Sequence, residues 1–376
     1  MNILIIGGGI AGLAFANFLE QNNVNYHLIE KQKNWKDGYV ISLWNNGLSV
    51  LRKLNLDLEL KNIGFVAKSQ KIYNNKGVIL KQDDFRKIKA QFQPAIQFLH
   101  RHELQRLLVS KLNKENIEFN QEVIAIEHLK GKTTVETKDG EKRNYDLVVG
   151  ADGGGSFVRK LLFSNGKVLN YNLVFFSFVT NYKDHGLTGN VEQLGNSKMF
   201  GIYPISNNKV GVYASAKPNP KYKDYSSQKL IQTYFSHFKG HAENILSHIE
   251  DVTDIISRPI QEVDLDNWYQ DNIVLIGDAA HAMLPTTGQG VSAALEDAMV
   301  LFDELKFTNF TDLQSSFSAF QHKRQKKNIP IQKNARFINK ILMIESIYIS
   351  LIRNFYLKFT PNNSNVKSLN NFFKKN

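Results

Sequence analysis

The strongest constraint on the fold of this chain lies at its start, where an apolar run enters a glycine-rich turn. Residues 3–6 read Ile-Leu-Ile-Ile, as expected of a parallel strand that is covered on both faces. Glycines then follow in the spacing GxGxxG, and a helical segment comes next. Because glycine has no Cβ, such a turn can close tightly and bring backbone N–H groups to a pyrophosphate. The expected phosphate contacts are Gly7, Gly9, Ile10, Ala11 and Gly12.

The second predicted strand, residues 26–30, ends in a carboxylate. Glu30 can accept hydrogen bonds from both ribose hydroxyls of an adenosine, and Lys31 follows it at the same edge. A glycine turn could in principle bind nothing, but an acid at this spacing favours a bound dinucleotide. The motif alone leaves open whether that dinucleotide is FAD or NAD.

Two later motifs favour FAD, since each is a strand that ends in a turn before a helix. The first covers residues 146–159, and the second covers residues 274–281 and continues to Gly290. A carboxylate at Asp278 could accept hydrogen bonds from the ribityl hydroxyls of a flavin, which NAD lacks. A helix starting at Gly290 would direct its N–H groups toward the N1 edge of a reduced flavin. The expected contacts are Asp152, Asp278, Pro285, Gly288, Gln289, Gly290 and Val291.

Together these motifs resemble the GxGxxG, DG and GD fingerprints of the single-component FAD-dependent aromatic hydroxylases, the class A flavoprotein monooxygenases. Arg101-His102-Glu103-Leu104 resembles the family element whose arginine contacts FAD, and the segment from Asp37 to Gly47 resembles the flavin-side segment. The resemblance covers essentially the whole chain. Its layout is most similar to short hydroxylases of alkylquinolones, urate and phenazines, and more loosely to tetracycline-inactivating flavoenzymes.

The resemblance implies an FAD-dependent monooxygenase. NADH or NADPH would reduce the flavin, O2 would form a C4a-hydroperoxide, and one oxygen atom would pass to an aromatic or heteroaromatic small molecule. No second dinucleotide fingerprint is found, in keeping with transient binding of the nicotinamide. The resemblance also implies FAD contacts at Arg101 and at Val123, and places Asp152 near the pyrophosphate.

An aromatic-rich block, residues 168–217, is expected to form antiparallel strands that cover the flavin. A dry pocket is required there, because water would divert the reaction to H2O2. The candidates for substrate contact are Phe178, Phe200, Tyr203, Tyr213 and Pro285, although any of the aromatic residues could instead be plain sheet core. The hydroxyl of Tyr203 or Tyr213 could orient or help to deprotonate a substrate.

The predicted fold class is mixed α/β: a Rossmann-like FAD-binding domain, an inserted antiparallel substrate domain and a long C-terminal helix. The FAD-binding domain is expected to be discontinuous, over residues 1–70, 100–167 and 260–321. The substrate domain would comprise residues 71–99 and 168–259. Helices are expected over residues 229–249, 290–307 and 331–359, the last one followed by a stop at Thr360-Pro361-Asn362 within the basic segment 322–376.

Composition limits the chemistry and the partners. The chain has no cysteine, which excludes thiolate nucleophiles and iron–sulfur clusters, and its histidines show no metal-ligand spacing, so we expect no metal. His281 is more plausibly structural than a proton relay. From residue 322 onward, twelve lysines and arginines face one acid, Glu345, which allows peripheral contact with an anionic membrane but carries no nucleic-acid motif. We expect a cytoplasmic monomer or homodimer, since no leader or membrane span is apparent.

Three alternatives remain open from the sequence. A flavin-dependent reductase or oxidase would share the first two fingerprints. A flavin-bound scaffold or sensor would not need a helix start at the flavin's N1 edge. A plain NAD dehydrogenase would purify colourless.

Overall fold

The computed structural model describes residues 1–376 except 35–37, 90–92, 130, 164–165, 184 and 376. Its first layer is a six-stranded sheet in the order β18-β19-β12-β1-β2-β8, parallel except for β18. The strands are β1 (Ile3–Ile6), β2 (Tyr26–Glu30), β8 (Ile117–Phe119), β12 (Leu147–Gly150), β18 (Tyr269–Gln270) and β19 (Ile273–Leu275). The apolar run at the start of the chain is the buried centre of this sheet, as predicted.

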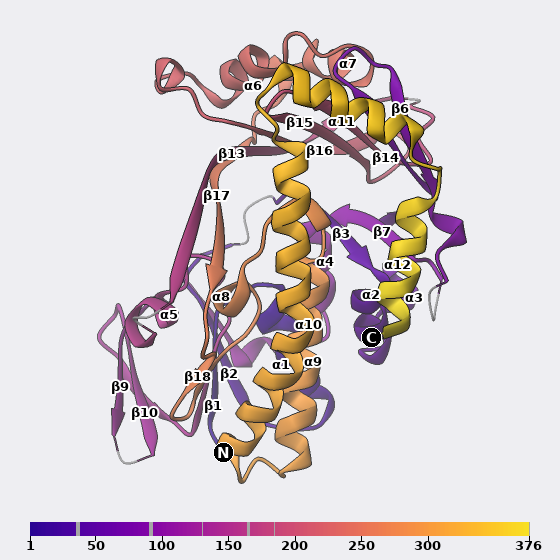
Figure 1. The fold of residues 1–376 in the computed structure, drawn as a ribbon. Coiled ribbons are helices and arrows are strands. Elements are labelled where there is room, and N and C mark those ends of the chain that lie inside the picture. The colour runs from indigo at the N-terminus through magenta and orange to yellow at the C-terminus, as the bar shows by residue number, and fades with distance from the viewer. Residues whose placement is uncertain (35–37, 90–92, 130, 164–165, 184, 376) are drawn as a thin grey trace.

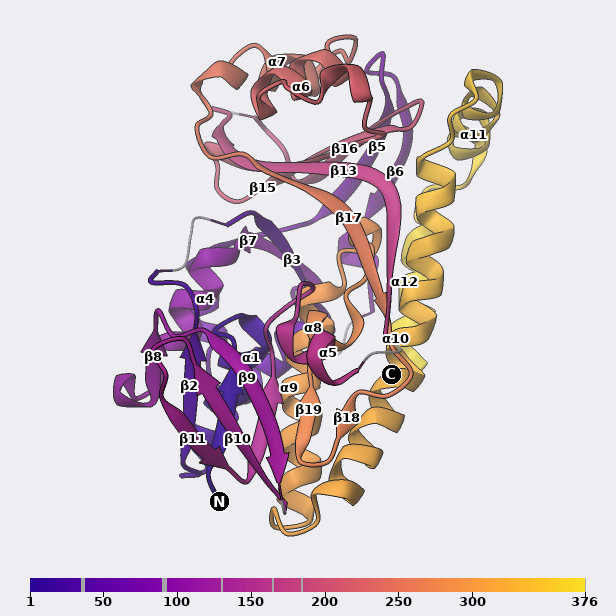
Figure 2. The same ribbon diagram turned by 90° about the vertical axis from the view of Figure 1, so that its left-hand side faces the viewer.

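Helices cover one face of the first sheet and a small antiparallel sheet covers the other (Figure 2). The helices are α1 (Ile10–Gln21), α4 (Arg101–Val109) and α9 (Gly290–Phe307). The small sheet consists of β9 (Val123–Leu129), β10 (Lys132–Thr137) and β11 (Lys142–Tyr145). Short helices α5 (Phe157–Leu162) and α8 (Asp278–His281) are the next elements after β12 and β19, so both turns lie at the carboxyl edge of the sheet.

The second layer is a seven-stranded sheet in the order β17-β13-β16-β15-β14-β5-β6. Its strands are β5 (Ser69–Asn74), β6 (Ile79–Asp84), β13 (Lys167–Asn181), β14 (Gly189–Gly195), β15 (Lys198–Pro204), β16 (Lys209–Ala216) and β17 (Ile256–Asp264). The long strands β13 and β17 run from the first layer up into this sheet (Figure 2). Its outer face carries α6 (Ser227–Phe235) and α7 (His241–Leu246) (Figure 1). The single helix predicted over 229–249 is therefore wrong, because Gly240 has φ +71° and starts a second helix.

A third sheet lies between these two bodies. It consists of β3 (Val40–Trp44), β7 (Ile96–His100) and β4 (Gly64–Val66). The helices α2 (Asn45–Lys53) and α3 (Asp57–Leu60) lie between β3 and β4 in the chain. The predicted mixed α/β class with an inserted antiparallel sheet is confirmed. We propose the predicted domain boundaries unchanged, since β5 and β6 join the second sheet and not the first.

The C-terminal segment is three helices where one was predicted. They are α10 (Leu313–Leu342), α11 (Ile347–Phe359) and α12 (Ser364–Lys375). The helix breaks after Leu342 because Ser346 caps α11 and because Ser197 donates its N–H to the carbonyl of Ile344. The predicted stop at residues 360–362 is only a turn, after which α12 packs beside β6 and β7 (Figure 1).

Candidate functional site

Backbone contacts close the glycine turn between β1 and α1. Gly7 has φ +110°, and a Cβ there would lie 2.5 Å from the carbonyl oxygen of Ala151. A Cβ on Gly12 would lie 2.1 Å from the carbonyl oxygen of Gly7. No side chain caps α1 at Gly9. The start of this helix is therefore open to an anion, as a pyrophosphate site requires.

The acid at the end of β2 is held in place with spare acceptor capacity. One carboxylate oxygen of Glu30 accepts the N–H of Gly8 at 2.8 Å, and the other accepts the N–H of Gln32 at 2.8 Å. Each oxygen keeps a second lone pair, which could accept a ribose hydroxyl. Lys31 is exposed at the same edge. Val123 packs its side chain into the core, so a contact with FAD could come only from its backbone.

Arg101 places a cation beside the glycine turn. Its guanidinium donates to the amide oxygen of Gln105 at 2.9 Å, and Gln105 donates in turn to the carbonyl of Gly8 at 3.2 Å. A Cβ built on Gly9 would lie 3.9 Å from the Arg101 guanidinium. An arginine in this place can pair with a phosphate at the start of α1.

The DG turn is tied to the other two turns. One oxygen of Asp152 accepts the N–H groups of Phe157 at 2.7 Å and Val158 at 3.2 Å, and thereby holds the start of α5. The other oxygen is buried and has no hydrogen-bond partner in the described part of the chain. Arg159 donates to the carbonyl of Ala279 at 2.8 Å, which joins α5 to α8.

The GD turn meets the first helix. Gly277 has φ +61°, and a Cβ there would lie 3.0 Å from the Cβ of Ala11. The side chain of Asp278 is accessible to solvent. Many protein atoms nevertheless surround it, and the resulting desolvation raises the pKa of its carboxyl group. The positive charge of Arg101 works in the opposite direction. Asp278 therefore faces an interior, solvent-accessible space between the turns.

His281 belongs to a buried network and not to that space. Its ring contacts the carboxylate of Asp297 and lies 4.8 Å from the ring of Trp268. Burial alone would raise the pKa of Asp297, but the charges of His281 and Arg324 lower it to about 2. Asp297 also accepts the N–H of Gly277 at 2.8 Å. The histidine thus joins α8 to α9 and α10, which supports a structural part for it.

The start of α9 opens toward the third sheet. Gly288 has φ +62°, and a Cβ there would lie 3.3 Å from Nε1 of Trp44. A Cβ on Gly290 would meet nothing within 4 Å, and Gln289 is buried with an amide oxygen that has no partner among the described residues. Pro285 is exposed at the beginning of the preceding turn, and Val291 is half-buried in the first turn of α9.

The three turns lie together at one edge of the first sheet, as predicted. Their chemistry fits FAD: an uncapped helix start and Arg101 for the pyrophosphate, Glu30 for a ribose, Asp278 for ribityl hydroxyls, and the start of α9 for the flavin ring. Which of the predicted atoms contact FAD stays a prediction. Asp37, at the start of the flavin-side segment, lies outside the described residues.

Two of the predicted substrate contacts are wrong. Phe178 and Phe200 are 1% and 0% exposed and pack in the core beneath α6, where Phe200 meets Phe235 at 5.3 Å. Side chains alternate along a strand, so Tyr203 and Tyr213 lie on the opposite, inner face of the sheet. Both tyrosines are half-buried there, and burial raises the pKa of each hydroxyl. At neutral pH they are hydrogen-bond donors and not bases.

The inner face also carries an acid that the sequence analysis missed. Glu192, on β14, uses one carboxylate oxygen to accept hydrogen bonds from Tyr203 (3.2 Å), Gln70 (3.1 Å) and Asn190 (3.1 Å). The residue is half-buried without an ion pair among the described residues, and burial raises its pKa. The only signal in the sequence is a lone acid within Asn-Val-Glu-Gln-Leu, which by itself indicates no role in a site.

Tyr203 connects this acid to the predicted flavin end of the site. Its ring lies 5.3 Å from that of Phe98 on β7, and it packs in the same cluster as Trp44. Trp44 in turn approaches Gly288 at the start of α9, so this cluster lies between the second sheet and the predicted flavin end. The second sheet touches the third directly, because a Cβ on Gly211 would lie 2.2 Å from Val40.

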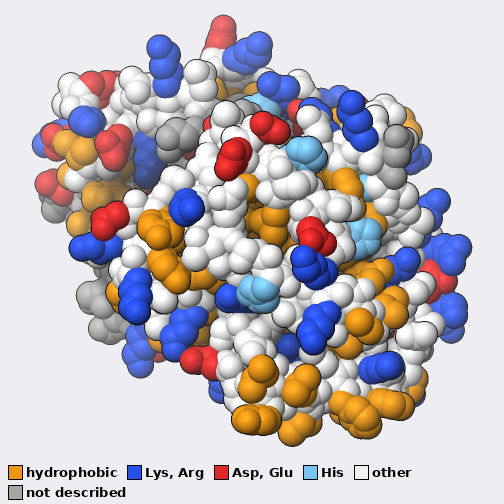
Figure 3. All heavy atoms as spheres, turned by 90° about the horizontal axis from the view of Figure 1, so that it is seen from above, with side chains coloured by type: hydrophobic (Ala, Val, Ile, Leu, Met, Phe, Trp, Pro, Cys, Tyr) orange, Lys and Arg blue, Asp and Glu red, His pale blue; other side chains and the backbone are white. Residues whose placement is uncertain are grey.

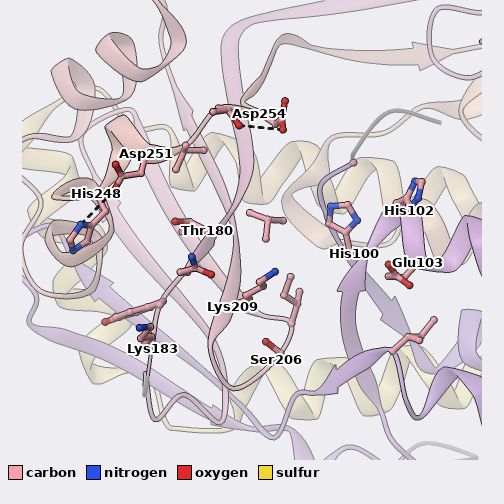
Figure 4. Close-up of a pocket in the computed structure, with 18 of the residues that line it drawn as sticks. His100, His102, Glu103, Thr180, Lys183, Ser206, Lys209, His248, Asp251 and Asp254 are labelled. Carbon is pink, nitrogen blue, oxygen red and sulfur yellow. Dashed lines mark hydrogen bonds and ion pairs between the residues drawn. The ribbon is translucent and has the colours of Figure 1, made fainter. Parts of the chain in front are cut away.

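A groove of about 1110 Å³ begins at the residues on either side of Arg101 (Figure 4). His100, His102 and Glu103 form one wall, while Lys183, Ser206 and Lys209 come from the ends of β13, β15 and β16 and the segments next to them. A third group, from His248 to Asp254, closes it beyond α7. The groove carries both polar and apolar side chains and lies beside Arg101, whose guanidinium approaches the glycine turn.

The fold and these turns define an FAD-dependent flavoprotein. The family model described as FAD binding domain matches residues 1–310, and the chain belongs to this family. It is similar to 2-heptyl-3-hydroxy-4(1H)-quinolone synthase of Pseudomonas aeruginosa, with 28% identity over 97% of this chain and 95% of that protein. The chain is accordingly an FAD-dependent oxidoreductase of the flavoprotein monooxygenase class.

Solved structures show the same fold. Klebsiella pneumoniae HpxO, complexed with FAD and uric acid, superposes with a TM-score of 0.89 at 19% identity over 100% of this chain and 97% of that one. The tetracycline destructase Tet(51) superposes with a TM-score of 0.75 at 21% identity, over 98% and 97% of the two chains.

Proposed function

We propose that this monooxygenase uses NADH or NADPH and O2 to hydroxylate a heteroaromatic molecule that carries an N–H or O–H group. The observation behind the proposal is the pair Glu192–Tyr203 on the inner face of the second sheet. One carboxylate oxygen of the half-buried Glu192 accepts three hydrogen bonds, and its second oxygen could accept a hydrogen bond from a ligand. A hydrocarbon substrate would leave that oxygen unpaired, at a cost in binding.

The chain's own residues would bind and orient the reactants. Bound FAD would supply the redox chemistry that activates O2. The uncapped start of α9 would stabilise negative charge at the flavin ring, through N–H groups at Gly290 and beyond. Tyr203 would hold Glu192 in position, and the ring of Phe98 behind it would help to exclude water.

The groove beside Arg101 supports the choice of electron donor. It offers His102, Arg106 and Lys209 to the phosphates of a nicotinamide dinucleotide without any second Rossmann fold. Arg101 itself approaches the glycine turn, so a donor in the groove would lie next to the flavin site.

Similar proteins support the substrate class. One of them is named for a 3-hydroxyquinolone product, and a structural neighbour contains uric acid. Both compounds are nitrogen heterocycles with polar hydrogens. A carboxylate such as Glu192 could accept hydrogen bonds from these groups.

A substrate screen tests this proposal. The FAD-loaded protein would be mixed with quinolones, purines and phenazines, with NADH or NADPH and isotopically labelled O2. We expect one class to accelerate NAD(P)H oxidation and to gain one labelled oxygen, detected by mass spectrometry. Oxidation that yields only H2O2 with every compound would overturn the proposal in favour of an oxidase.

A further inference from the structure

Helix α11 turns Ser350, Arg353 and Leu357 toward the protein and its other large apolar side chains outward. Of its thirteen residues, only Ser350 and Arg353 are buried. Large apolar side chains make up the opposite side, namely Ile347, Tyr348, Ile349, Leu351, Ile352, Phe355, Tyr356 and Phe359. Their exposure ranges from 52% for Ile349 to 77% for Tyr348. A surface helix of a globular protein normally has the reverse orientation.

Specific hydrogen bonds hold the polar side against the protein. Arg353 donates to the carbonyl oxygens of Leu342 at 3.0 Å and Gly195 at 3.3 Å, and Ser350 donates to Asn196 at 2.6 Å. Burial lowers the pKa of Arg353 to about 10, so the side chain is still a cation at neutral pH. A buried cation is costly unless it is well bonded, and these contacts therefore define the orientation of the helix.

The exposed apolar side is wide. With 3.6 residues in each turn, the eight side chains span about 200° of the helix circumference. A partner helix or a flat protein surface would cover a stripe of roughly 100°. A second copy of the chain would thus leave much of this surface in water, whereas a lipid interface can enclose all of it.

The surrounding charge favours an anionic surface. Four basic residues of α10 are already paired with acids: Lys323, Arg324 and Lys327 with acids of α9, and Arg336 with Glu262 of β17. The exposed Lys333, Lys340 and Lys358 have no ion pair in the part of the chain that the structure describes. The one acid of this segment, Glu345, is paired with Lys217 at 2.9 Å. In Figure 3, hydrophobic side chains gather at the lower edge over α11, with lysines and arginines beside them.

We propose that α11 lies in the surface of an anionic lipid bilayer, with its apolar side among the acyl chains and the flanking lysines at the headgroups. The aromatic residues Tyr348 and Tyr356 suit this interface because they combine an apolar ring with a polar end. No helix of the described residues is long and apolar enough to cross a membrane. The contact is therefore peripheral.

Vesicle flotation of the full-length FAD-loaded protein tests this inference. Vesicles would contain either phosphatidylcholine alone or equal parts of phosphatidylcholine and phosphatidylglycerol. The test variant is Ile352→Gln with Phe355→Gln. The matched control is Leu58→Gln with Phe307→Gln, since these side chains are 68% and 86% exposed but lie outside α11. Flavin absorbance in each preparation shows that the fold is retained.

We expect the wild type and the control to float with the mixed vesicles, and the test variant to partition at least about ten-fold more weakly. Binding to phosphatidylcholine alone should also be at least about ten-fold weaker. A wild type that stays with the lipid-free fractions, or a test variant that floats equally well, would overturn the inference. So would a dimer in light scattering that these substitutions abolish without any flotation, because α11 would then serve a second copy.

Discussion

The substitution Glu192→Gln changes one atom of the inner face of the second sheet and leaves the surrounding bonds in place. Three donors, from Tyr203, Gln70 and Asn190, reach the same oxygen of Glu192. A glutamine oxygen can accept the same three bonds. The second carboxylate oxygen becomes an amide NH2, so an acceptor is replaced by a donor.

The magnitude follows from the bond that is lost. A hydrogen bond to a charged group contributes about 1.5–3 kcal/mol when its partner is otherwise buried. If the substrate donates to Glu192, its KM in the variant should rise about 10- to 100-fold. FAD content should not change, because Glu192 contacts none of the three turns.

The assay is substrate-stimulated NAD(P)H oxidation, followed over a range of substrate concentrations in parallel for wild type and variant. Glu262→Gln is the matched control. Glu262, on β17, is a fully buried carboxylate that pairs with Arg336 of α10 at 2.9 Å. An unchanged KM in Glu192→Gln, or an equal change in Glu262→Gln, would refute the assignment of Glu192 to the substrate.

The pH dependence gives a second check. Burial raises the pKa of Glu192, so its folded-state value lies above its unfolded value. Ionisation therefore costs stability, and this cost is absent at low pH and appears as the pH rises through the folded pKa. Glu192→Gln, which cannot ionise, should melt at a higher temperature than the wild type at neutral pH, and the difference should vanish near about pH 4. A difference that grows on acidification would contradict the sign.

Three further substitutions test the flavin site and the network behind it. Gly12→Ala places a Cβ 2.1 Å from a backbone oxygen and should weaken FAD binding about ten-fold or more, whereas Gly154→Ala, with 3.7 Å of room, should remain yellow. Arg101→Ala should raise the Kd for FAD about 10- to 100-fold in a flavin fluorescence titration, and a similar loss in the exposed Arg106→Ala would argue against a phosphate contact. Asp297→Asn should cost about 3–5 kcal/mol at neutral pH. Since the pKa of Asp297 is about 2, thermal melts should show this wild-type advantage above about pH 4 and its decline toward pH 2, and a difference independent of pH would count against it.

The flavin end of the site could be predicted because backbone geometry creates it. At Gly7, Gly12 and Gly277 the main chain lies so close to another backbone or Cβ atom that only glycine fits. A glycine at these positions of the sequence therefore indicates the contact. Glu30 ends one strand and Asp278 closely follows another, and the carboxyl ends of these strands share one edge of a parallel sheet. Their proximity follows from topology, which the alternation of strands and helices indicates.

The substrate end could not be predicted in the same way. Phe200 and Tyr203 lie three residues apart on one strand, and the sequence does not say which face is covered by helices. Only the packing of α6 on one side decides that Phe200 is core and that Tyr203 is not. Glu192 could not be predicted as a site residue because its role depends on hydrogen bonds from Tyr203 and Gln70, which lie on other strands.

The C-terminal segment shows the same limit for helices. Its apolar periodicity predicted one amphipathic helix over 331–359 but did not say which side of the helix faces the protein. In α11 most apolar side chains face outward, because Arg353 is bonded inside to the carbonyl oxygens of Leu342 and Gly195, and only Leu357 packs against a core cluster. Periodicity shows that a helix has one polar and one apolar side. Which side packs against the protein depends on the hydrogen-bond acceptors that the protein presents to the helix. An outward apolar side is therefore evidence for a second, non-aqueous environment at that surface.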